Sequence, residues 1–448
     1  MSGSDAINRR QFLERSSLLA AAAAAGARAA GAQGNNSAAV EVKPVRLGFV
    51  GVGIRGTLLM EAAAGIAGVE IKAVADCYKG HLARAAELIS PAPAMTGDYR
   101  EILSRPDVDA VVIAVPDHWH LRMTQEALTA GKHVYVEKPM THRWEDGEAF
   151  IAAVEKSGKV VQVGSQYVSM GGAQKAAQLI KSGQLGQVTL VEGTIHRNTP
   201  TGAWYYPIPP DASPETVDFK TFLGPAPARE FDLRRFFQWR LFWDYSGGLP
   251  TDLFVHLVTA THQLMGVQEP ESVFAFADIY QWKNYREVPD QMAAMVKYPE
   301  GFVLRLSSTA INGHPGPVLT FYGTEGTLEY NGDSFRYYYE PRGESFEYST
   351  HSWPKATVDE FRRRMNLSDK LTPLDAPASA EPVEYKSSDE DSTRAHVRSW
   401  VEAIRTGGKP VEDVRFGHHA ALVGHMCNLS FRAGKPVRWN KATQKVEA

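Results

Sequence analysis

The stretch Val45-Arg46-Leu47-Gly48-Phe49-Val50-Gly51-Val52-Gly53-Ile54-Arg55-Gly56 decides the fold of the first part of this chain. Its apolar first half predicts a short β-strand, and its second half has the pattern Gly-x-Gly-x-x-Gly at the start of an Ala-rich helical stretch. In such a turn the first glycine permits the bend, the second lets the backbone approach a pyrophosphate, and the third lets helix pack on strand. Free N–H groups at the helix start can bind the phosphates. The predicted dinucleotide-binding residues of this turn are Gly51, Gly53, Ile54, Arg55 and Gly56.

Asp76 is a carboxylate at the position expected after a dinucleotide-binding glycine turn. Asp76 ends the next predicted strand, Val69–Ala75, and follows Gly56 by 76 − 56 = 20 residues. A carboxylate there accepts hydrogen bonds from the adenosine ribose and repels a 2′-phosphate. NAD is therefore favoured as the cofactor, with NADP kept as the alternative because Lys79 is close by in sequence.

Strands and helix-length segments alternate through the first third of the chain. Residues 109–115 are almost continuously apolar, as expected of a strand buried on both faces, and residues 133–136 and 160–163 follow at helix-length intervals. This alternation predicts a parallel, doubly wound sheet. The first predicted domain is a Rossmann dinucleotide-binding domain of the α/β class over residues 44–165.

The pattern changes after residue 166. Predicted strands follow one another across short turns, which indicates an open and mostly antiparallel sheet; they cover residues 187–195, 272–280, 291–297, 302–309, 318–322 and 327–330. We expect an α/β substrate-binding domain over 166–395 with long insertions at 198–230 and 350–392. Residues 396–448 are predicted to be a helical segment that packs back on the two domains.

Composition excludes several classes of function. Lys and Arg number 48 and Asp and Glu 51, so the net charge of −3 gives the chain no electrostatic preference for nucleic acid. Two distant cysteines, Cys77 and Cys427, form neither a disulfide framework nor a four-cysteine zinc site. His118 and His120 lack a recognised zinc spacing, so no metal site is predicted.

The N-terminus has the features of an export signal. A twin-arginine motif, Arg9-Arg10-Gln11-Phe12-Leu13, precedes a ten-residue apolar run over 18–27 and a small-residue exit, Ala30-Gly31-Ala32. The run is too short for the ~20 residues of a membrane span, and no span is predicted elsewhere. We expect residues 1–32 to be a twin-arginine signal peptide that directs the folded protein through the twin-arginine export machinery, to the periplasm or otherwise out of the cytoplasm.

A second signature lies at the predicted carboxyl ends of later strands. It comprises Pro116-Asp117-His118-Trp119-His120 after one strand and Glu137-Lys138-Pro139 after the next, and Ala130-Gly131-Lys132-His133-Val134 leads into the latter. With the glycine turn and Gly323-Thr324-Glu325-Gly326-Thr327-Leu328, these segments resemble the Gfo/Idh/MocA family of oxidoreductases over residues 44–440. The resemblance implies a Rossmann domain followed by an α/β domain with an open antiparallel sheet.

The resemblance also implies the catalytic residues. The catalytic lysine of the family corresponds to Lys138, and its Asp–His pair corresponds to Asp252 and His256, which the i, i+4 spacing places on one helical face. Oxidation of a carbinol requires removal of a hydride and of the hydroxyl proton. A histidine can take that proton near neutral pH, and a lysine can hold the oxygen. Either Lys138 or His256 could move the proton. Asp252 is the orienting partner of the imidazole, or shares a substrate hydroxyl with it.

Other residues of the crevice are expected to bind cofactor or substrate. Glu137 is expected to position backbone or the nicotinamide ribose, His120 to border the nicotinamide, and Pro116 and Gln166 to line the same crevice. Twelve aromatic residues lie between Trp204 and Tyr245. Among them Trp239, together with Arg240, suits the apolar face and polar rim of a sugar ring.

Export constrains how the cofactor is used. Free NAD is not expected outside the cytoplasm, so the cofactor is predicted to be non-dissociating and regenerated in place. The leading hypothesis is a sugar, cyclitol or polyol oxidoreductase. The alternative is a redox-neutral, NAD-dependent glycosidase, and a third is a non-catalytic sugar-binding relative, which intact Lys138 and His256 disfavour. The family resemblance also predicts a homodimer or homotetramer.

Overall fold

The computed structural model describes residues 43–340, 345–374, 381–387 and 391–447. The predicted signal peptide, residues 1–32, lies outside these residues, as does part of the insertion predicted at 350–392. In the described ranges, no helix is both long and apolar enough to cross a membrane.

The first domain is built on a six-stranded sheet in the order β3-β2-β1-β4-β5-β6, and every neighbouring pair is parallel. The predicted Rossmann fold is therefore confirmed. Its strand order reverses between β1 and β4, so a crevice opens there at the carboxyl ends of the strands. The strands are β1 (Val45–Val50), β2 (Val69–Ala75), β3 (Ala94–Thr96), β4 (Ala110–Ile113), β5 (His133–Glu137) and β6 (Val161–Gly164).

Helices cover both faces of this sheet, as the doubly wound arrangement requires. β1 and β4 contain almost only buried apolar residues, and β5 has three in a row between His133 and Glu137, which is why the sequence pattern identified them. β3 was missed because it is three residues long and largely exposed. The helices are α2 (Ile54–Ala64), α3 (Lys79–Leu88), α4 (Tyr99–Leu103), α5 (His120–Thr129) and α6 (Gly147–Ser157).

The second domain contains a ten-stranded sheet in the order β14-β13-β12-β11-β7-β10-β9-β8-β15-β16. β7 and β10 pair in parallel and all other neighbours pair antiparallel, so the sheet is mixed but mostly antiparallel, as predicted. Its strands are β7 (Val188–His196), β8 (Ser272–Asp278), β9 (Gln291–Lys297), β10 (Val303–Thr309), β11 (Leu319–Gly323), β12 (Gly326–Tyr330), β13 (Ser334–Tyr339), β14 (Val383–Lys386), β15 (Val437–Asn440) and β16 (Lys445–Glu447).

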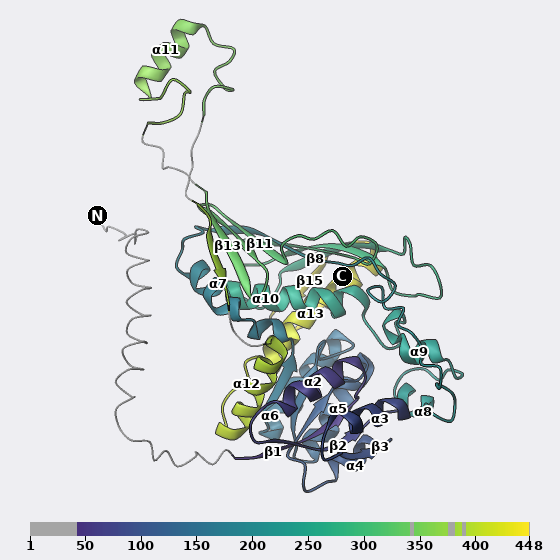
Figure 1. The fold of residues 1–448 in the computed structure, drawn as a ribbon. Helices are drawn as coiled ribbons and strands as arrows, with labels where there is room; N and C mark the ends of the chain where they lie inside the picture. Colours follow the sequence, from purple (N-terminus) through teal and green to yellow (C-terminus); the bar gives the residue numbers. More distant parts are fainter. Residues whose placement is uncertain (1–42, 341–344, 375–380, 388–390, 448) are drawn as a thin grey trace, which may run out of the picture. The chain divides into compact units, whose positions relative to one another are not determined.

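One face of this sheet is covered by α7 (Gly171–Lys181), α10 (Val255–Met265) and α13 (Val414–Ala433) (Figure 1). α10 contacts both other helices, and all three contact strands of the sheet. The opposite face is open: burial alternates residue by residue along β9, so every second side chain is exposed. Alternation of this kind made the central strands predictable.

The C-terminal segment differs from the helical prediction. α12 (Ser392–Thr406) packs on α2 of the Rossmann domain, and α13 packs on β8, so this part connects the two domains. The last residues are not helical, because β15 and β16 add two strands to the second sheet. Each is too short for its alternation to be recognised from sequence.

The two insertions have little regular structure. The first contains α8 (Phe219–Leu223) and is followed by α9 (Leu233–Phe237). The described part of the second contains α11 (Lys355–Arg364), where Phe346 and Trp353 pack edge-on against Phe361.

Candidate active site

The glycine turn joins β1 to α2 in the backbone geometry that a phosphate-binding turn requires. Gly51 has a φ of +81°, and a Cβ there would lie 2.5 Å from the main-chain oxygen of Ala114. A Cβ on Gly56 would lie 2.0 Å from the main-chain oxygen of Gly51. Both positions therefore exclude any side chain, while Gly53 has more room, its nearest neighbour being His81 at 3.4 Å. The turn leaves space at its outer surface, where a pyrophosphate would bind.

Asp76 fixes this turn. Its Oδ2 accepts a hydrogen bond from the main-chain N–H of Val52 at 2.8 Å, and its Oδ1 accepts one from Tyr78 at 2.9 Å. The ring of His81 lies 3.1 Å from the same Oδ1. The carboxylate thus stands beside the turn at the end of β2, where the ribose of a dinucleotide would meet it.

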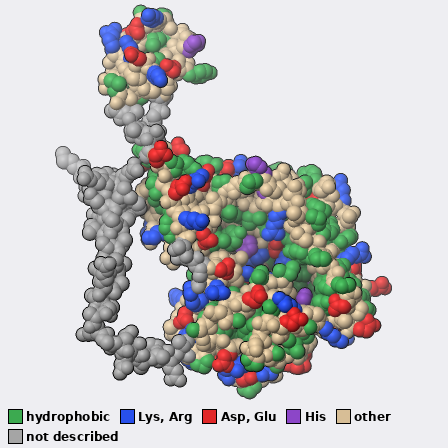
Figure 2. All heavy atoms as spheres, viewed as in Figure 1, with side chains coloured by type: hydrophobic (Ala, Val, Ile, Leu, Met, Phe, Trp, Pro, Cys, Tyr) green, Lys and Arg blue, Asp and Glu red, His purple; other side chains and the backbone are tan. Residues whose placement is uncertain are grey.

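A cavity of about 530 Å³ lies at the carboxyl ends of the Rossmann strands and is lined by both domains. Figure 2 shows basic and histidine side chains inside the hollow between the two domains. The cavity is lined by these sequence-predicted residues: Gly51, Gly53, Ile54, Arg55, Asp76, Pro116, Glu137, Lys138, Gln166, Trp239, Arg240, Asp252 and His256. Gly56 lies behind the turn instead, because its role is close packing.

Lys138 and Asp252 meet in this cavity from different domains. Lys138 Nζ, just after β5, donates to the main-chain oxygen of Asp252 at 2.8 Å and to its Oδ1 at 3.1 Å. Arg240 Nε donates to the same Oδ1 at 3.1 Å. Burial raises the pKa of Asp252, but the two cations more than offset this and hold it well below its usual range. Asp252 is therefore an ionised carboxylate shared between two cations.

His256 lies in the first turn of α10, directly after a π-helical turn, Pro250–Phe254. Its ring stacks on Tyr167 with centroids 4.6 Å apart. Neither ring nitrogen has a hydrogen-bond partner among the residues that the structure describes. Burial and the nearby Lys138 charge hold the pKa of His256 well below its usual value, so the imidazole is neutral and able to accept a proton.

The predicted orientation of His256 by Asp252 requires correction. No hydrogen bond joins the two side chains in the described part of the chain, although they are four residues apart. The carboxylate is held by Lys138 and Arg240 instead, because two cations attract it more strongly than a neutral imidazole does. Packing on Tyr167 orients the His256 ring.

Glu137 connects several residues of the crevice. Its Oε1 accepts a hydrogen bond from Arg55 Nε at 2.6 Å, and its Oε2 accepts one from the main-chain N–H of Lys138 at 3.2 Å. Arg55 also donates to Oε1 of Gln166 at 3.2 Å. This network links the glycine turn to the ends of β5 and β6 and holds the backbone that carries Lys138.

His120 does not line the cavity, contrary to the expectation that it borders the nicotinamide. The side chain is buried, with Nδ1 at 2.6 Å from the main-chain oxygen of Pro139 and Nε2 at 2.9 Å from that of Val115. Both ring nitrogens are used by the backbone, so His120 holds together the two segments that follow β4 and β5.

Asp117 is a cavity residue that sequence reasoning did not select. It follows Pro116 at the end of β4, is 4% exposed, and lines the cavity with Lys138 and Asp252. Burial raises the pKa of Asp117 to about 8, with Lys138 opposing the rise. The side chain is therefore a neutral acid at pH 7. Its position at a carboxyl strand end was the signal that could have identified it.

Arg197 is the second cavity residue that was missed. It follows β7 directly, and its main-chain N–H donates to Thr309 O at 2.9 Å, which anchors it to the neighbouring β10. It lines the same cavity as Asp252 and His256, and its positive charge contributes to lowering the pKa of both. Arg197 belongs to no motif that the sequence analysis identified, and only the folded structure brings the end of β7 to the cavity.

The proline-rich insertion closes over the end of β2. We call residues 211–218 the strap. The main-chain N–H of Asp218 donates to Cys77 O at 2.8 Å, that of Lys79 donates to Thr216 O at 3.0 Å, and Tyr78 Oη donates to Asp211 Oδ1 at 2.5 Å. These bonds tie the second domain to the backbone next to Asp76.

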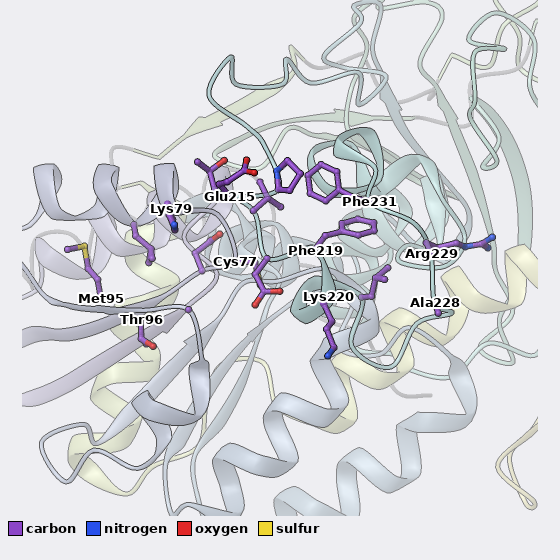
Figure 3. A pocket seen from close by; sticks show the side chains of 18 residues that line it. Cys77, Lys79, Met95, Thr96, Glu215, Phe219, Lys220, Ala228, Arg229 and Phe231 are labelled. Atoms are coloured by element: carbon purple, nitrogen blue, oxygen red, sulfur yellow. The ribbon is translucent and has the colours of Figure 1, made fainter.

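A second recess of about 800 Å³ lies beside the strap and shares Asp76, Cys77 and Gly97 with the main cavity. Figure 3 shows Met95 and Thr96 on the Rossmann side of this recess, facing residues of the insertion. The crevice beside Asp76 is therefore lined by both domains.

Most of the aromatic residues between Trp204 and Tyr245 are part of the hydrophobic core or pack against it. Trp204, Phe242 and Tyr245 are buried in the main cluster of the second domain. Trp239 lines the cavity, and the Arg240 guanidinium lies 4.2 Å from its ring centroid. In the described ranges, no group of three or more His, Cys, Asp or Glu side chains is placed to hold a metal ion.

Comparison with family models matches both domains. Residues 45–165 match the model of an oxidoreductase family described as its NAD-binding Rossmann fold, and residues 177–438 match the C-terminal alpha/beta domain of the same family. The first domain is therefore an NAD-binding domain.

Curated relatives cover the chain in part. An alpha-N-acetylgalactosaminidase of Shewanella oneidensis is 30% identical over 229 residues, which is 44% of this chain and 50% of the relative. A glycosyl hydrolase family 109 protein of Shewanella baltica is 39% identical over 129 residues, or 27% and 28% of the two chains. This chain thus spans half or less of the length of these relatives.

Solved structures share the fold over nearly their full length. A levoglucosan dehydrogenase in complex with NADH and levoglucosan superposes with a TM-score of 0.64 at 21% identity, covering 88% of this chain and 99% of the other. An aldose-aldose oxidoreductase from Caulobacter crescentus gives a TM-score of 0.62 at 20% identity, covering 88% and 100%.

Proposed function

Because this chain belongs to the Gfo/Idh/MocA oxidoreductase family, whose two domains it carries, we propose that it is an enzyme that moves a hydride between NAD and a hydroxyl of a sugar, cyclitol or polyol. One observation carries the proposal. Lys138 of the Rossmann domain and His256 of the second domain line the same cavity as the glycine turn. A cation and a neutral base at that place are what carbinol oxidation requires.

The cavity residues fit the cofactor. The turn Gly51–Gly56, where side chains at Gly51 and Gly56 would collide with backbone, leaves room for a pyrophosphate, and Asp76 is placed for a ribose. When bound, NAD supplies the hydride acceptor. The Arg55–Glu137–Gln166 network holds the neighbouring strand ends.

The protein residues then handle the proton. Lys138 holds the substrate oxygen and stabilises its developing negative charge, while Asp252 holds the ammonium in place. His256, neutral and without a hydrogen-bond partner in the described part of the chain, takes the hydroxyl proton. Lys138 remains the alternative proton acceptor.

The cofactor is proposed to stay bound between turnovers. The strap ties the second domain across the end of β2, so the adenosine side opens only if several hydrogen bonds break. This retention suits a protein exported through the twin-arginine pathway, since the surroundings would supply no NAD. The exposed apolar side chains Phe276 and Met295 on the open sheet face provide a surface for pairing of two copies.

A redox-neutral glycosidase is the second candidate, supported by the curated relatives named above. In that reaction the same base and cation would take the proton and hold the oxygen of a sugar hydroxyl whose hydride passes to NAD and later returns, and an acid would protonate the departing glycosidic oxygen. Asp117, a buried neutral acid in the cavity, provides such a proton. Release of an aryl aglycone without net formation of NADH would favour this candidate.

Native mass spectrometry of the exported protein, followed by a sugar screen that monitors nicotinamide absorbance, tests the main proposal. We expect bound NAD and a change in absorbance with one class of sugar or polyol. The proposal fails if the protein carries no nicotinamide and oxidises no sugar when NAD or a second carbonyl acceptor is added.

A further inference from the structure

Most charged side chains that line the cavity are paired. Arg55 bonds Glu137 at 2.6 Å, and His81 lies 3.1 Å from Asp76. Lys138 and Arg240 share Asp252. Arg197 is different, because its guanidinium has no hydrogen bond or ion pair with any residue that the structure describes.

The charge around Asp252 is therefore positive. Three cations, Lys138, Arg240 and Arg197, stand against the single carboxylate of Asp252, a balance of 3 − 1 = +2. If Asp117 also ionised, the balance would be 3 − 2 = +1. In either state the catalytic end of the cavity holds more positive than negative charge.

The cofactor does not account for this excess. The phosphates of a dinucleotide bind at the glycine turn and the N-terminus of α2, where backbone N–H groups meet them. Arg197 instead follows β7 of the second domain and lines the cavity with Asp252 and His256 of the same domain. A half-buried guanidinium without a counter-charge is unfavourable, so an anion from outside the protein is expected to meet it.

We propose that the substrate is a sugar bearing an anionic group and that Arg197 binds this group. The inference rests on the proposed function, since it names the substrate class of the same site. A guanidinium pairs with a planar carboxylate through two parallel hydrogen bonds, so a sugar acid such as a uronate is the expected form. The anchored strand end that carries Arg197 keeps the position of this contact fixed.

The experiment compares matched neutral and acidic sugars on the full-length protein with its bound nicotinamide. Glucose is compared with glucuronate, and galactose with galacturonate, by affinity from calorimetry and by kcat/KM. For kcat/KM a second carbonyl acceptor is present to re-oxidise the bound nicotinamide in place, and product formation is followed. A sugar sulfate and a sugar phosphate distinguish a carboxylate site from a general anion site. We expect the acid of at least one pair to be preferred by about tenfold or more, and its binding to weaken as salt is raised.

Variants assign the preference to Arg197. Arg197→Gln should lower the acid-to-neutral ratio of kcat/KM by about 10- to 100-fold, mainly through KM, and Arg197→Lys should restore part of it. Arg305→Gln is the matched control, because Arg305 is exposed on β10 and pairs with Glu192 outside the cavity. This control should leave the ratio unchanged.

The outcomes separate the inference from the proposed function. Equal or better use of neutral sugars, or an equal loss for both members of a pair in Arg197→Gln, overturns the role of Arg197. If no sugar is oxidised but acids still bind more tightly in an Arg197-dependent way, the anion site stands and the proposed function fails. If neutral sugars are oxidised and acids neither bind nor react, the proposed function stands and the anion site fails.

Discussion

Lys138 donates a hydrogen bond from Nζ to Oδ1 of Asp252 at 3.1 Å, across 114 residues of sequence and between the two domains. The side chains are 10% and 13% exposed, so the pair is largely removed from water. A buried charge without its partner is strongly unfavourable. The contact therefore positions the lysine in the cavity and also helps to hold the domains together.

Removing the carboxylate should impair turnover more than folding. In Asp252→Asn, Lys138 and Arg240 lose their shared counter-charge, and the lysine is no longer held in place. We expect kcat to fall by about 100-fold while circular dichroism still reports a folded protein. Asp107→Asn, which breaks a surface pair with Arg105, is the control and should leave kcat unchanged. An unchanged kcat in Asp252→Asn would contradict the role of Asp252.

Replacing the proton-handling residues should separate chemistry from binding. His256→Ala and Lys138→Met should each lower single-turnover hydride transfer by about 100- to 10,000-fold, since each removes acid–base or charge stabilisation. The nicotinamide content, measured by native mass spectrometry, should persist, because the glycine turn is untouched. Full activity in both variants would contradict the roles assigned to His256 and Lys138.

Asp117 should make the free energy of unfolding depend on pH. Its pKa is raised to about 8 in the folded protein, while an unfolded chain has an Asp pKa of about 3.9. The folded state therefore holds a proton that the unfolded state releases. The stabilisation is fully present below about pH 4 and is lost as pH rises through about 8, at up to about 1.4 kcal/mol per pH unit.

Urea unfolding from about pH 4 to 9 of wild type and Asp117→Asn measures this effect as a difference, which removes the contributions of other groups. The free energy of unfolding of the wild type minus that of Asp117→Asn should fall from about pH 4 to about 8 and level off above that. A difference that does not vary with pH would mean that Asp117 is ionised in the folded protein.

Loosening the strap should release the cofactor. Tyr78→Phe removes the hydrogen bond from Tyr78 Oη to Asp211 Oδ1, one of the contacts that close the adenosine end. We expect nicotinamide to dissociate about 10- to 100-fold faster on dilution, followed by absorbance or native mass spectrometry. Tyr338→Phe is the matched control, since its hydroxyl also donates to a carboxylate, that of Glu329, away from the cavity. Equal rates of nicotinamide release from the two variants would mean that the strap does not retain the cofactor.

Much of the fold followed from local pattern. The glycine turn, the apolar runs of β1 and β4 and the alternation along β9 all leave periodic or steric marks in sequence. Strands without such marks were missed, β3 because it is short and exposed and β15 because it is only four residues long.

The sequence by itself determined the parts whose chemistry is local: a glycine turn before a helix, a carboxylate at the end of β2, and a lysine directly after β5. Tertiary structure decided which side chains meet. It joined Lys138 to Asp252, placed Arg197 beside them and brought Asp211 to Tyr78, over separations that no sequence period records. It also decided that His120 contacts backbone oxygens of Pro139 and Val115 and does not line the cavity, because burial and hydrogen bonding depend on neighbours from other elements.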